Sequence, residues 1–164
     1  MIRFAQEKDL KEIAEIHLHN RKAAYQGIMN ERYLNGLTQE SVYEQWVIYY
    51  RKADRKILVY DLGGIVAGFS GVRFFNGKMN CGLLDYFHTK EEYRHRGIGR
   101  ALWTASCSLL LSEGIQNMEL FCVEGNDSAK KFYENIGATF NGFKIRTYTS
   151  VSYTHLRAHE TGRN

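Results

Sequence analysis

Apolar residues recur along this chain with two periods, one typical of helices and one typical of strands. Helical spacing predicts helices over 9–19, 41–49, 97–111 and 126–136. Short apolar runs between turn residues predict strands over 2–4, 57–60, 65–74, 79–88, 118–123 and 140–148, with a loop or broken helix over 25–29. The order of these elements, with three consecutive strands near the middle, predicts a mixed α/β domain with a central meander.

Small polar residues mark where several of these elements begin or turn. Gly63-Gly64 predicts a hairpin between the second and third strands, and Asn76-Gly77 predicts a second turn. Ser41, three residues before Glu44, has the spacing of a capping box at a helix start. Asn126 is expected to cap the short helix that follows it.

The composition narrows the class of protein. With 164 residues, of which 44% are hydrophobic, the chain is long enough for one domain with a buried core. No apolar run approaches the roughly 20 residues that span a bilayer, and residues 1–7 do not resemble a signal peptide. We therefore expect a cytoplasmic protein without a membrane partner.

The charge is mildly basic, with a formal net value of +4. Basic residues are scattered among acidic ones, apart from a cluster over 94–100 and the pair Lys130-Lys131. This pattern suits a small polyanion better than a nucleic-acid backbone. The three cysteines lie far apart inside apolar runs and are expected to be buried thiols, with neither a disulfide framework nor metal-ligand spacing.

The strongest candidate for chemistry is the segment Tyr93–Leu102, which contains Arg-x-x-Gly-x-Gly. It follows a predicted strand and opens a predicted helix. Glycines there allow backbone N–H groups to approach an anion, and the positive end of the helix dipole points to the same place. The segment lacks the Gly-Lys-Ser/Thr of a Walker loop and the third glycine of a dinucleotide fingerprint. It therefore predicts a phosphate or pyrophosphate site, the alternative being a turn that needs glycine for steric reasons.

Two blocks of the sequence resemble the Gcn5-related N-acetyltransferase (GNAT) family. The first is Arg94–Leu102, and the second is 123–138, with Asn126, Ala129, Phe132-Tyr133 and Gly137 in the family's order. The likeness covers residues 2 to about 148, although Glu91 stands where the family usually has proline and Ala138-Thr139-Phe140 replaces the commoner Gly-Phe. It implies a central mixed, mostly antiparallel twisted sheet flanked by helices.

The resemblance also implies an activity and a binding site. The activity is direct transfer of an acetyl group from acetyl-CoA, as co-substrate, to a primary amine. The implied cofactor-binding residues are Phe87, His88, Thr89, Arg94, His95, Arg96, Gly97, Ile98, Gly99, Arg100, Asn126 and Lys130. Backbone N–H groups of the 94–100 loop would bind the pyrophosphate, and those near Phe87–Thr89 would bind the thioester carbonyl.

Two residues are the candidate catalytic groups. Tyr133 occupies the position at which the family supplies a proton to the departing thiolate, the alternative being an aromatic on the helix surface with its hydroxyl in water. Asp85 is expected to share a strand face with Phe87 and Thr89 and could be the general base. The alternative for Asp85 is a structural ion pair with an arginine or lysine. Glu119 and His88 are weaker candidates for the base.

The C-terminal residues 150–164 do not resemble the end of this fold. They are similar to translated sequencing-adapter read-through and are set apart as a non-native tail, which leaves 1–149 as the acetyltransferase domain. The family's last strand is therefore expected to be missing or replaced by the tail. His155 and His159 in the tail are not taken as a metal site.

Several alternatives stay open from the sequence alone. A non-catalytic acyl-CoA-binding domain of the same fold would need the 94–100 loop but neither catalytic residue. A polyamine, an aminoglycoside, an amino acid and a protein N-terminus are all possible acceptors, and the mixed charge of residues 20–50 does not favour a strongly anionic one. No nucleic-acid partner is expected, and the protein could be a monomer or a homodimer.

Overall fold

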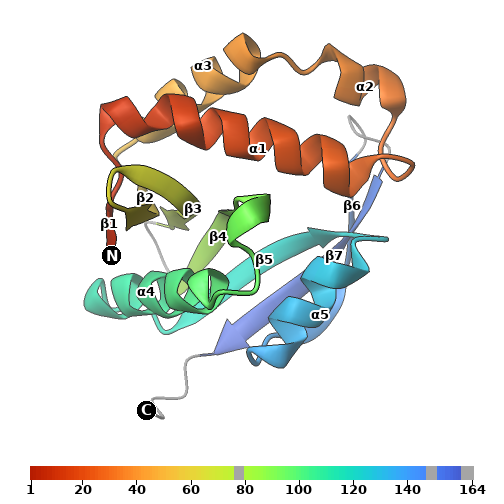
Figure 1. Ribbon diagram of the computed structural model, residues 1–164. Helices are drawn as coiled ribbons and strands as arrows, with labels where there is room; N and C mark the ends of the chain where they lie inside the picture. Colours follow the sequence, from red (N-terminus) through yellow and green to blue (C-terminus); the bar gives the residue numbers. More distant parts are fainter. Residues whose placement is uncertain (76–79, 147–150, 160–164) are drawn as a thin grey trace.

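A seven-stranded sheet runs through the protein with helices on both faces (Figure 1). The computed structural model describes residues 1–75, 80–146 and 151–159. The strands are β1 (Ile2–Phe4), β2 (Arg55–Leu62), β3 (Ile65–Phe74), β4 (Cys81–Thr89), β5 (Asn117–Val123), β6 (Thr139–Arg146) and β7 (Val151–His159). Their spatial order is β1-β2-β3-β4-β5-β7-β6.

The helices divide between the two faces of this sheet. They are α1 (Leu10–Tyr25), α2 (Glu31–Gly36), α3 (Gln39–Tyr50), α4 (Ile98–Ser112) and α5 (Asp127–Asn135), with short 3-10 turns at Glu7–Asp9 and Glu91–Tyr93. Alternation along β2 explains the division, because Ile57 and Val59 pack with α1 and α3 whereas Leu58 packs with Ile98 and Leu102 of α4. Both faces of the middle of β2 are therefore buried beneath helices.

Strands β4 and β5 form a parallel pair that separates towards its C-terminal end. The registered pairs run from Cys81–Asn117 to Leu84–Leu120, whereas β4 continues to Thr89 and β5 to Val123. The other neighbouring strands are antiparallel. This arrangement confirms the predicted mostly antiparallel mixed sheet and leaves backbone of β4 beyond Leu84 outside its ladder with β5.

A β-bulge in β4 coincides with this separation. Gly71 pairs with Tyr86 and Val72 pairs with Leu84, so that Asp85 is an extra residue in the ladder. A bulge bends its strand and increases the local twist. The bend therefore falls where β4 leaves β5.

The helix predictions were mostly right in place and less accurate at the ends. Helix α1 continues six residues beyond the predicted His19 to Tyr25, and the unpredicted α2 follows it. The predicted start of α3 at Ser41 was wrong, because Thr38 is the N-cap. The Thr38 hydroxyl accepts a hydrogen bond from Ser41 N at 3.1 Å, and the Ser41 hydroxyl accepts one from Thr38 N at 3.1 Å. Ser41 thus completes the capping box from its third position instead of starting it.

The C-terminal tail takes part in the sheet. Its residues Val151–His159 form β7, which lies between β5 and β6 and pairs antiparallel with both. The tail therefore occupies the place of a further strand, as one of the two expected outcomes. The Asn76-Gly77 turn and the end of the strand predicted over 140–148 lie outside the described residues. Within the described part of the chain, no helix has the length and apolar character needed to span a bilayer.

Candidate active site

The start of α4 has the geometry of an anion-binding loop. His95 and Gly97 both have left-handed backbone conformations, with φ of 60° and 79°, and Gly97 is the N-cap of the helix. No side chain of the described residues caps the first turn, so its N–H groups point out of the helix end without a side-chain acceptor. Successive N–H groups in such a turn form a concave anion site, reinforced by the helix dipole.

The two glycines of this loop have different roles. A Cβ on Gly97 would meet nothing within 4 Å, so glycine is needed there for its positive φ. A Cβ on Gly99 would lie 3.2 Å from Phe132 Cζ and 3.8 Å from Phe87 Cε1. Gly99 therefore allows α4, α5 and the end of β4 to approach one another closely.

The basic side chains of the loop are exposed around this helix end. His95, Arg96 and Arg100 are exposed, and the Arg96 guanidinium lies 5.5 Å from the centre of the Tyr93 ring. Ile98, by contrast, is buried among Leu58, Ala67 and Leu102, so only its backbone can face a ligand. The structure thus brings together the loop residues predicted to bind the cofactor.

Arg94 is held by a residue that the sequence analysis did not single out. Its Nη2 donates to Asn20 Oδ1 at 3.0 Å, and Asn20 Nδ2 donates to the Thr89 carbonyl at 2.9 Å. Asn20 is 6% exposed and lies on α1. One buried amide therefore ties the end of β4 to the loop. The sequence signal that could have identified Asn20 as a buried residue was its spacing of three from His17, on the buried face of α1.

Phe87 and His88, two of the three cofactor candidates on β4, lie on opposite faces of the sheet. Phe87 packs against Phe132 and Tyr133 of α5, with ring centres 5.6 and 5.9 Å away. The His88 ring lies on the opposite face, 5.0 Å from His17 and 5.2 Å from Phe69. A role of His88 towards the cofactor is therefore restricted to its backbone, because its side chain is packed on the other face of the sheet.

Tyr133 lies at the opening between β4 and β5. It is 9% exposed and contacts the rings of Phe87, Phe132 and Trp103. Burial raises the pKa of its hydroxyl, so that the group stays protonated at neutral pH. This position disagrees with the alternative of a solvated surface aromatic. It places the phenol beside Phe87, close to the start of α4.

The face predicted for Asp85 was wrong, because the bulge puts it opposite to Phe87 and Thr89. Its carboxylate accepts two hydrogen bonds from Arg73, at 2.6 and 2.9 Å, and one from the Tyr49 hydroxyl at 3.3 Å. Asp85 in turn raises the pKa of the Arg73 guanidinium. The structure therefore favours the ion-pair alternative for Asp85. Glu119 lies where β4 and β5 are still paired, before they separate.

The second block of the resemblance begins at the predicted cap. Asn126 is the N-cap of α5, and its Oδ1 accepts a hydrogen bond from Ala129 N at 3.3 Å, which confirms the capping role. Lys130 lies in the first turns of the same helix. Contacts of either residue with a cofactor stay a prediction.

Two histidines, His17 of α1 and His88 of β4, are buried side by side between α1 and the sheet. His17 Nδ1 accepts a hydrogen bond from Trp46 Nε1 at 3.1 Å, and His17 is 3% exposed. Burial, together with the nearby His88 and Arg21, holds the pKa of His17 well below 6.5. Burial, together with the charges of Arg21 and Arg94, lowers the pKa of His88 to about 3. Both rings are therefore neutral in the folded protein at neutral pH.

Acid should destabilise the fold through these two imidazoles. In the unfolded chain each has a pKa near 6.5, so below that pH the unfolded state binds more protons than the folded state. The stabilisation is complete above pH 6.5 and is lost as the pH falls towards the folded-state pKa. We expect each histidine to lower the free energy of unfolding by about 1.4 kcal/mol per pH unit in that window. Denaturant titrations between pH 7 and 5 give the free energy of unfolding at each pH. Its dependence on pH should be shallower for His88→Asn than for the wild type, and equal slopes would contradict this account.

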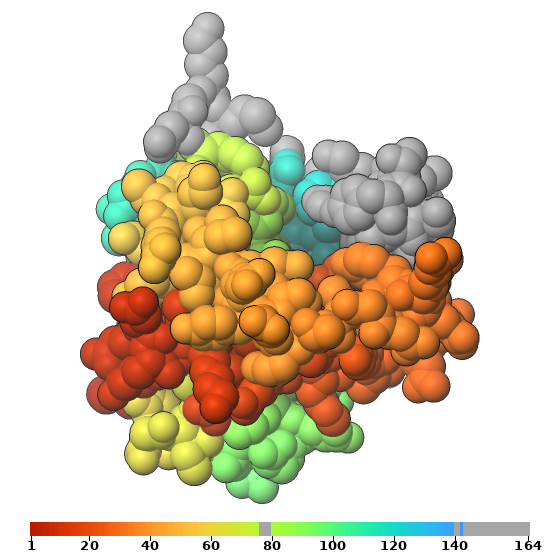
Figure 2. All heavy atoms as spheres, turned by 90° about the horizontal axis from the view of Figure 1, so that it is seen from above, coloured from red at the N-terminus to blue at the C-terminus, as the bar shows by residue number. Residues whose placement is uncertain are grey.

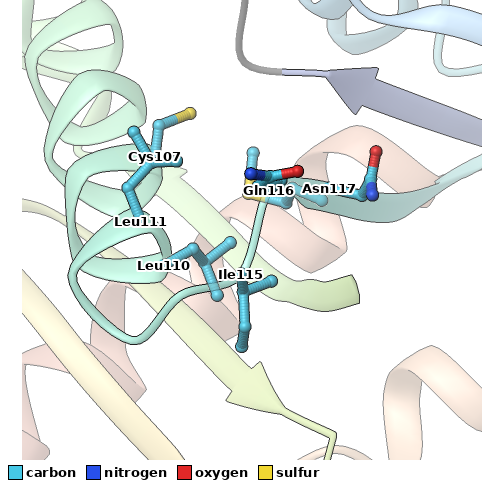
Figure 3. Close-up of a pocket in the computed structure, with 7 residues that line it drawn as sticks. Cys107, Leu110, Leu111, Ile115, Gln116 and Asn117 are labelled. Carbon is cyan, nitrogen blue, oxygen red and sulfur yellow. The ribbon is translucent and has the colours of Figure 1, made fainter. Parts of the chain in front are cut away.

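Three further observations concern a second pocket, the cysteines and possible metal ligands. A small pocket lies at the other end of α4, lined by Cys107, Leu110, Leu111, Ile115, Gln116, Asn117 and Met118 (Figure 3). It is mostly apolar and is separate from the loop at Gly97. The three cysteines are buried thiols, as predicted. Among the described residues, no group of three or more histidine, cysteine, aspartate or glutamate side chains could hold a metal ion.

Comparison with known proteins identifies the class. The sequence profile of the Acetyltransferase (GNAT) family matches residues 23–138, more than half of the chain. The chain therefore belongs to this family and is an acyl-CoA-dependent N-acyltransferase that uses acetyl-CoA as co-substrate, which confirms the resemblance seen in the sequence.

Individual relatives agree with this assignment. The chain is 28% identical over 129 residues to the uncharacterized N-acetyltransferase YuaI of Bacillus subtilis, covering 77% of this chain and 73% of that one. Among solved structures, the PaiA N-acetyltransferase of Thermoplasma acidophilum in complex with coenzyme A is similar with a TM-score of 0.79, 21% identity and 98% coverage of both chains. A ribosomal-protein-alanine N-acetyltransferase of Brucella melitensis is similar with a TM-score of 0.74, 20% identity and coverage of 98% and 99%. The last two likenesses show the shared fold.

Proposed function

We propose that this protein transfers the acetyl group of acetyl-CoA directly to a primary amine, with Tyr133 as the general acid. The observation that supports this proposal is the position of Tyr133. Its ring packs against Phe87 at the point where β4 has left β5, close to the uncapped start of α4. Pyrophosphate at the helix start and a thioester along the free edge of β4 would bring the sulfur towards this phenol.

The reaction proceeds by attack of the amine nitrogen on the thioester carbonyl. Backbone N–H groups of β4 near Phe87–Thr89 stabilise the oxyanion of the tetrahedral intermediate. The C–N bond forms, the C–S bond breaks, and the Tyr133 hydroxyl donates its proton to the departing sulfur. The nitrogen releases its own proton to water, and the phenol regains one from solvent. Because Arg73 and Tyr49 already occupy the Asp85 carboxylate, we assign it no part in this proton transfer.

Release of free coenzyme A tests this function. Purified protein is mixed with acetyl-CoA and a panel of primary amines, and the free thiol is followed with a chromogenic reagent. We expect thiol release above the rate of hydrolysis with at least one amine class, and mass spectrometry should show the acetylated amine. Thiol release that no amine accelerates would contradict transfer to a primary amine.

A further inference from the structure

Arg21 on α1 lies beside the free end of β4, outside the groups already given a role. It is one turn beyond His17, which contacts the Tyr86 and His88 rings of β4 at 5.1 and 5.0 Å. The charge of Arg21 is close enough to contribute, after burial, to the lowered pKa of His88, and it opposes the rise that burial causes in the pKa of Tyr86. The neighbouring Asn20 reaches the Thr89 carbonyl. The Arg21 side chain is therefore directed to the same end of β4 as the thioester site, from the face that α1 covers.

Its partner Tyr33 connects this position to β5. Arg21 Nη2 donates to the Tyr33 hydroxyl at 2.7 Å, and the guanidinium lies 5.3 Å from the centre of that ring. Tyr33, on α2, packs against the cluster that contains Val123 at the end of β5. Seen from above, blue-green atoms of the β5 region are visible beside the orange atoms that include α2 and α3 (Figure 2). The Arg21–Tyr33 pair thus links α1 to the apolar cluster at the end of β5.

The charge of Arg21 has no anionic partner in the described part of the chain. The Tyr33 hydroxyl is neutral, and Arg21 Nε is buried without a hydrogen-bond acceptor. Burial of such a donor is costly unless it is satisfied. The described residues therefore leave hydrogen-bonding capacity of this guanidinium unused, and a guanidinium is suited to a carboxylate.

The nearest charged and titratable groups of β4 and the loop are either paired with other residues or neutral. Asp85 is held by Arg73, and the imidazoles of His17 and His88 are neutral. Arg94 adds a second positive charge, with the neutral Asn20 amide as its hydrogen-bond acceptor. The pKa of nearby Glu91 is lowered first by its hydrogen bond with His19 and then by the charge of Arg94. A polycationic acceptor would therefore enter against two guanidinium groups, whereas a carboxylate beside the amine would be attracted.

We infer that the acceptor is an amino acid, bound with its carboxylate at Arg21 and its amine towards the thioester. The inference rests on the proposed function and narrows its acceptor class. Tyr33 holds the guanidinium in place from α2. A zwitterion of this kind also agrees with the mixed charge of residues 20–50.

Matched pairs of amines test this inference. Lysine and cadaverine, phenylalanine and phenethylamine, and tyrosine and tyramine differ within each pair only by the carboxylate. Each is titrated by calorimetry into the protein saturated with coenzyme A, and each is assayed with acetyl-CoA. We expect at least one acid to bind about tenfold or more tightly than its decarboxylated partner. Phosphoethanolamine and ethanolamine are compared in the same way as a pair that differs by a phosphate. The assignment is overturned if no amino acid binds more tightly than its decarboxylated partner, or if phosphoethanolamine is the only anionic amine that binds more tightly than its uncharged counterpart.

Variants at two neighbouring positions locate the effect. Arg21→Gln should raise the KM or Kd of the preferred acid about tenfold, leave its decarboxylated partner and the KM of acetyl-CoA nearly unchanged, and so remove the preference. Lys22→Gln, which removes one positive charge from an exposed position of the same helix, should change none of these values. A preference that survives in Arg21→Gln would overturn the role of Arg21.

The two readouts separate this inference from the proposed function. Acid-selective binding that depends on Arg21, without turnover of any amine, would support the acceptor site and count against acetyl transfer. Turnover with polyamines in preference to amino acids would support acetyl transfer and overturn the acceptor class.

Discussion

Replacing Tyr133 by phenylalanine should lower kcat by about 100-fold or more, with little change in the KM of acetyl-CoA. The substitution removes the proton donor but keeps the ring that packs against Phe87, Phe132 and Trp103. Because burial raises the pKa of the hydroxyl, the wild-type group stays protonated even where an exposed tyrosine, with a pKa of about 10, begins to ionise. Steady-state kinetics with the best amine of the panel measure the effect.

An exposed tyrosine provides the control for this experiment. Tyr50 at the end of α3 is 39% exposed, and Tyr50→Phe should leave kcat unchanged. The melting temperature of Tyr133→Phe should rise with acetyl-CoA as it does for the wild type, which shows that the cofactor still binds. A kcat within threefold of wild type in Tyr133→Phe would remove Tyr133 from the mechanism.

Asp85→Asn should destabilise the protein and leave kcat almost intact. The substitution leaves the Arg73 guanidinium, 28% exposed, without its charged partner beneath α3. Removing one partner of a fully buried pair costs about 3–5 kcal/mol, and partial exposure reduces this to roughly 2 kcal/mol here. For a chain of this length the expected fall in Tm is about 4–8 °C. Thermal melts and steady-state kinetics of the same preparation measure both quantities.

A double-mutant cycle shows whether the loss comes from the ion pair. If it does, Arg73→Gln combined with Asp85→Asn should cost less than the sum of the two single substitutions, by about 0.5–3 kcal/mol. Asp54→Asn, at a side chain 38% exposed, should barely change stability. A loss of kcat of about 100-fold in Asp85→Asn, with Tm unchanged, would instead restore Asp85 as the general base.

Local patterns predicted most of the fold because each depends on neighbours in sequence. The loop at Arg94–Gly99, the cap at Asn126 and the hairpin at Gly63-Gly64 each need only a few adjacent residues. The face of Asp85 could not be predicted in this way. A bulge is defined by the pairing of its strand with another strand, which the local sequence does not show. One extra residue interrupts the alternation of side chains, so that residues before and after it lie on opposite faces from those that regular alternation predicts.

The partners of the cofactor loop were equally beyond reach of the sequence pattern. Asn20 contacts Arg94 across 74 positions and Thr89 across 69. The spacing of Asn20 from His17 indicates only that Asn20 is buried on α1, and it does not indicate these contacts, because α1 reaches the loop only after the sheet has formed. The same holds for Arg21, whose charge acts on His88, 67 positions away in the sequence, because the fold places α1 against β4.

The bulge in β4 also means that the active site depends on the length of one strand. Without Asp85, Leu84 and Tyr86 would follow in regular alternation, and the ladder to β3 would continue without a bend. Nothing would then turn β4 away from β5 after Leu84, and their parallel pairing could extend over the edge that the thioester needs. Substitutions at position 85 change an ion pair, whereas a deletion there changes the number of residues and is expected to close the edge of β4 at which the proposed mechanism binds the thioester.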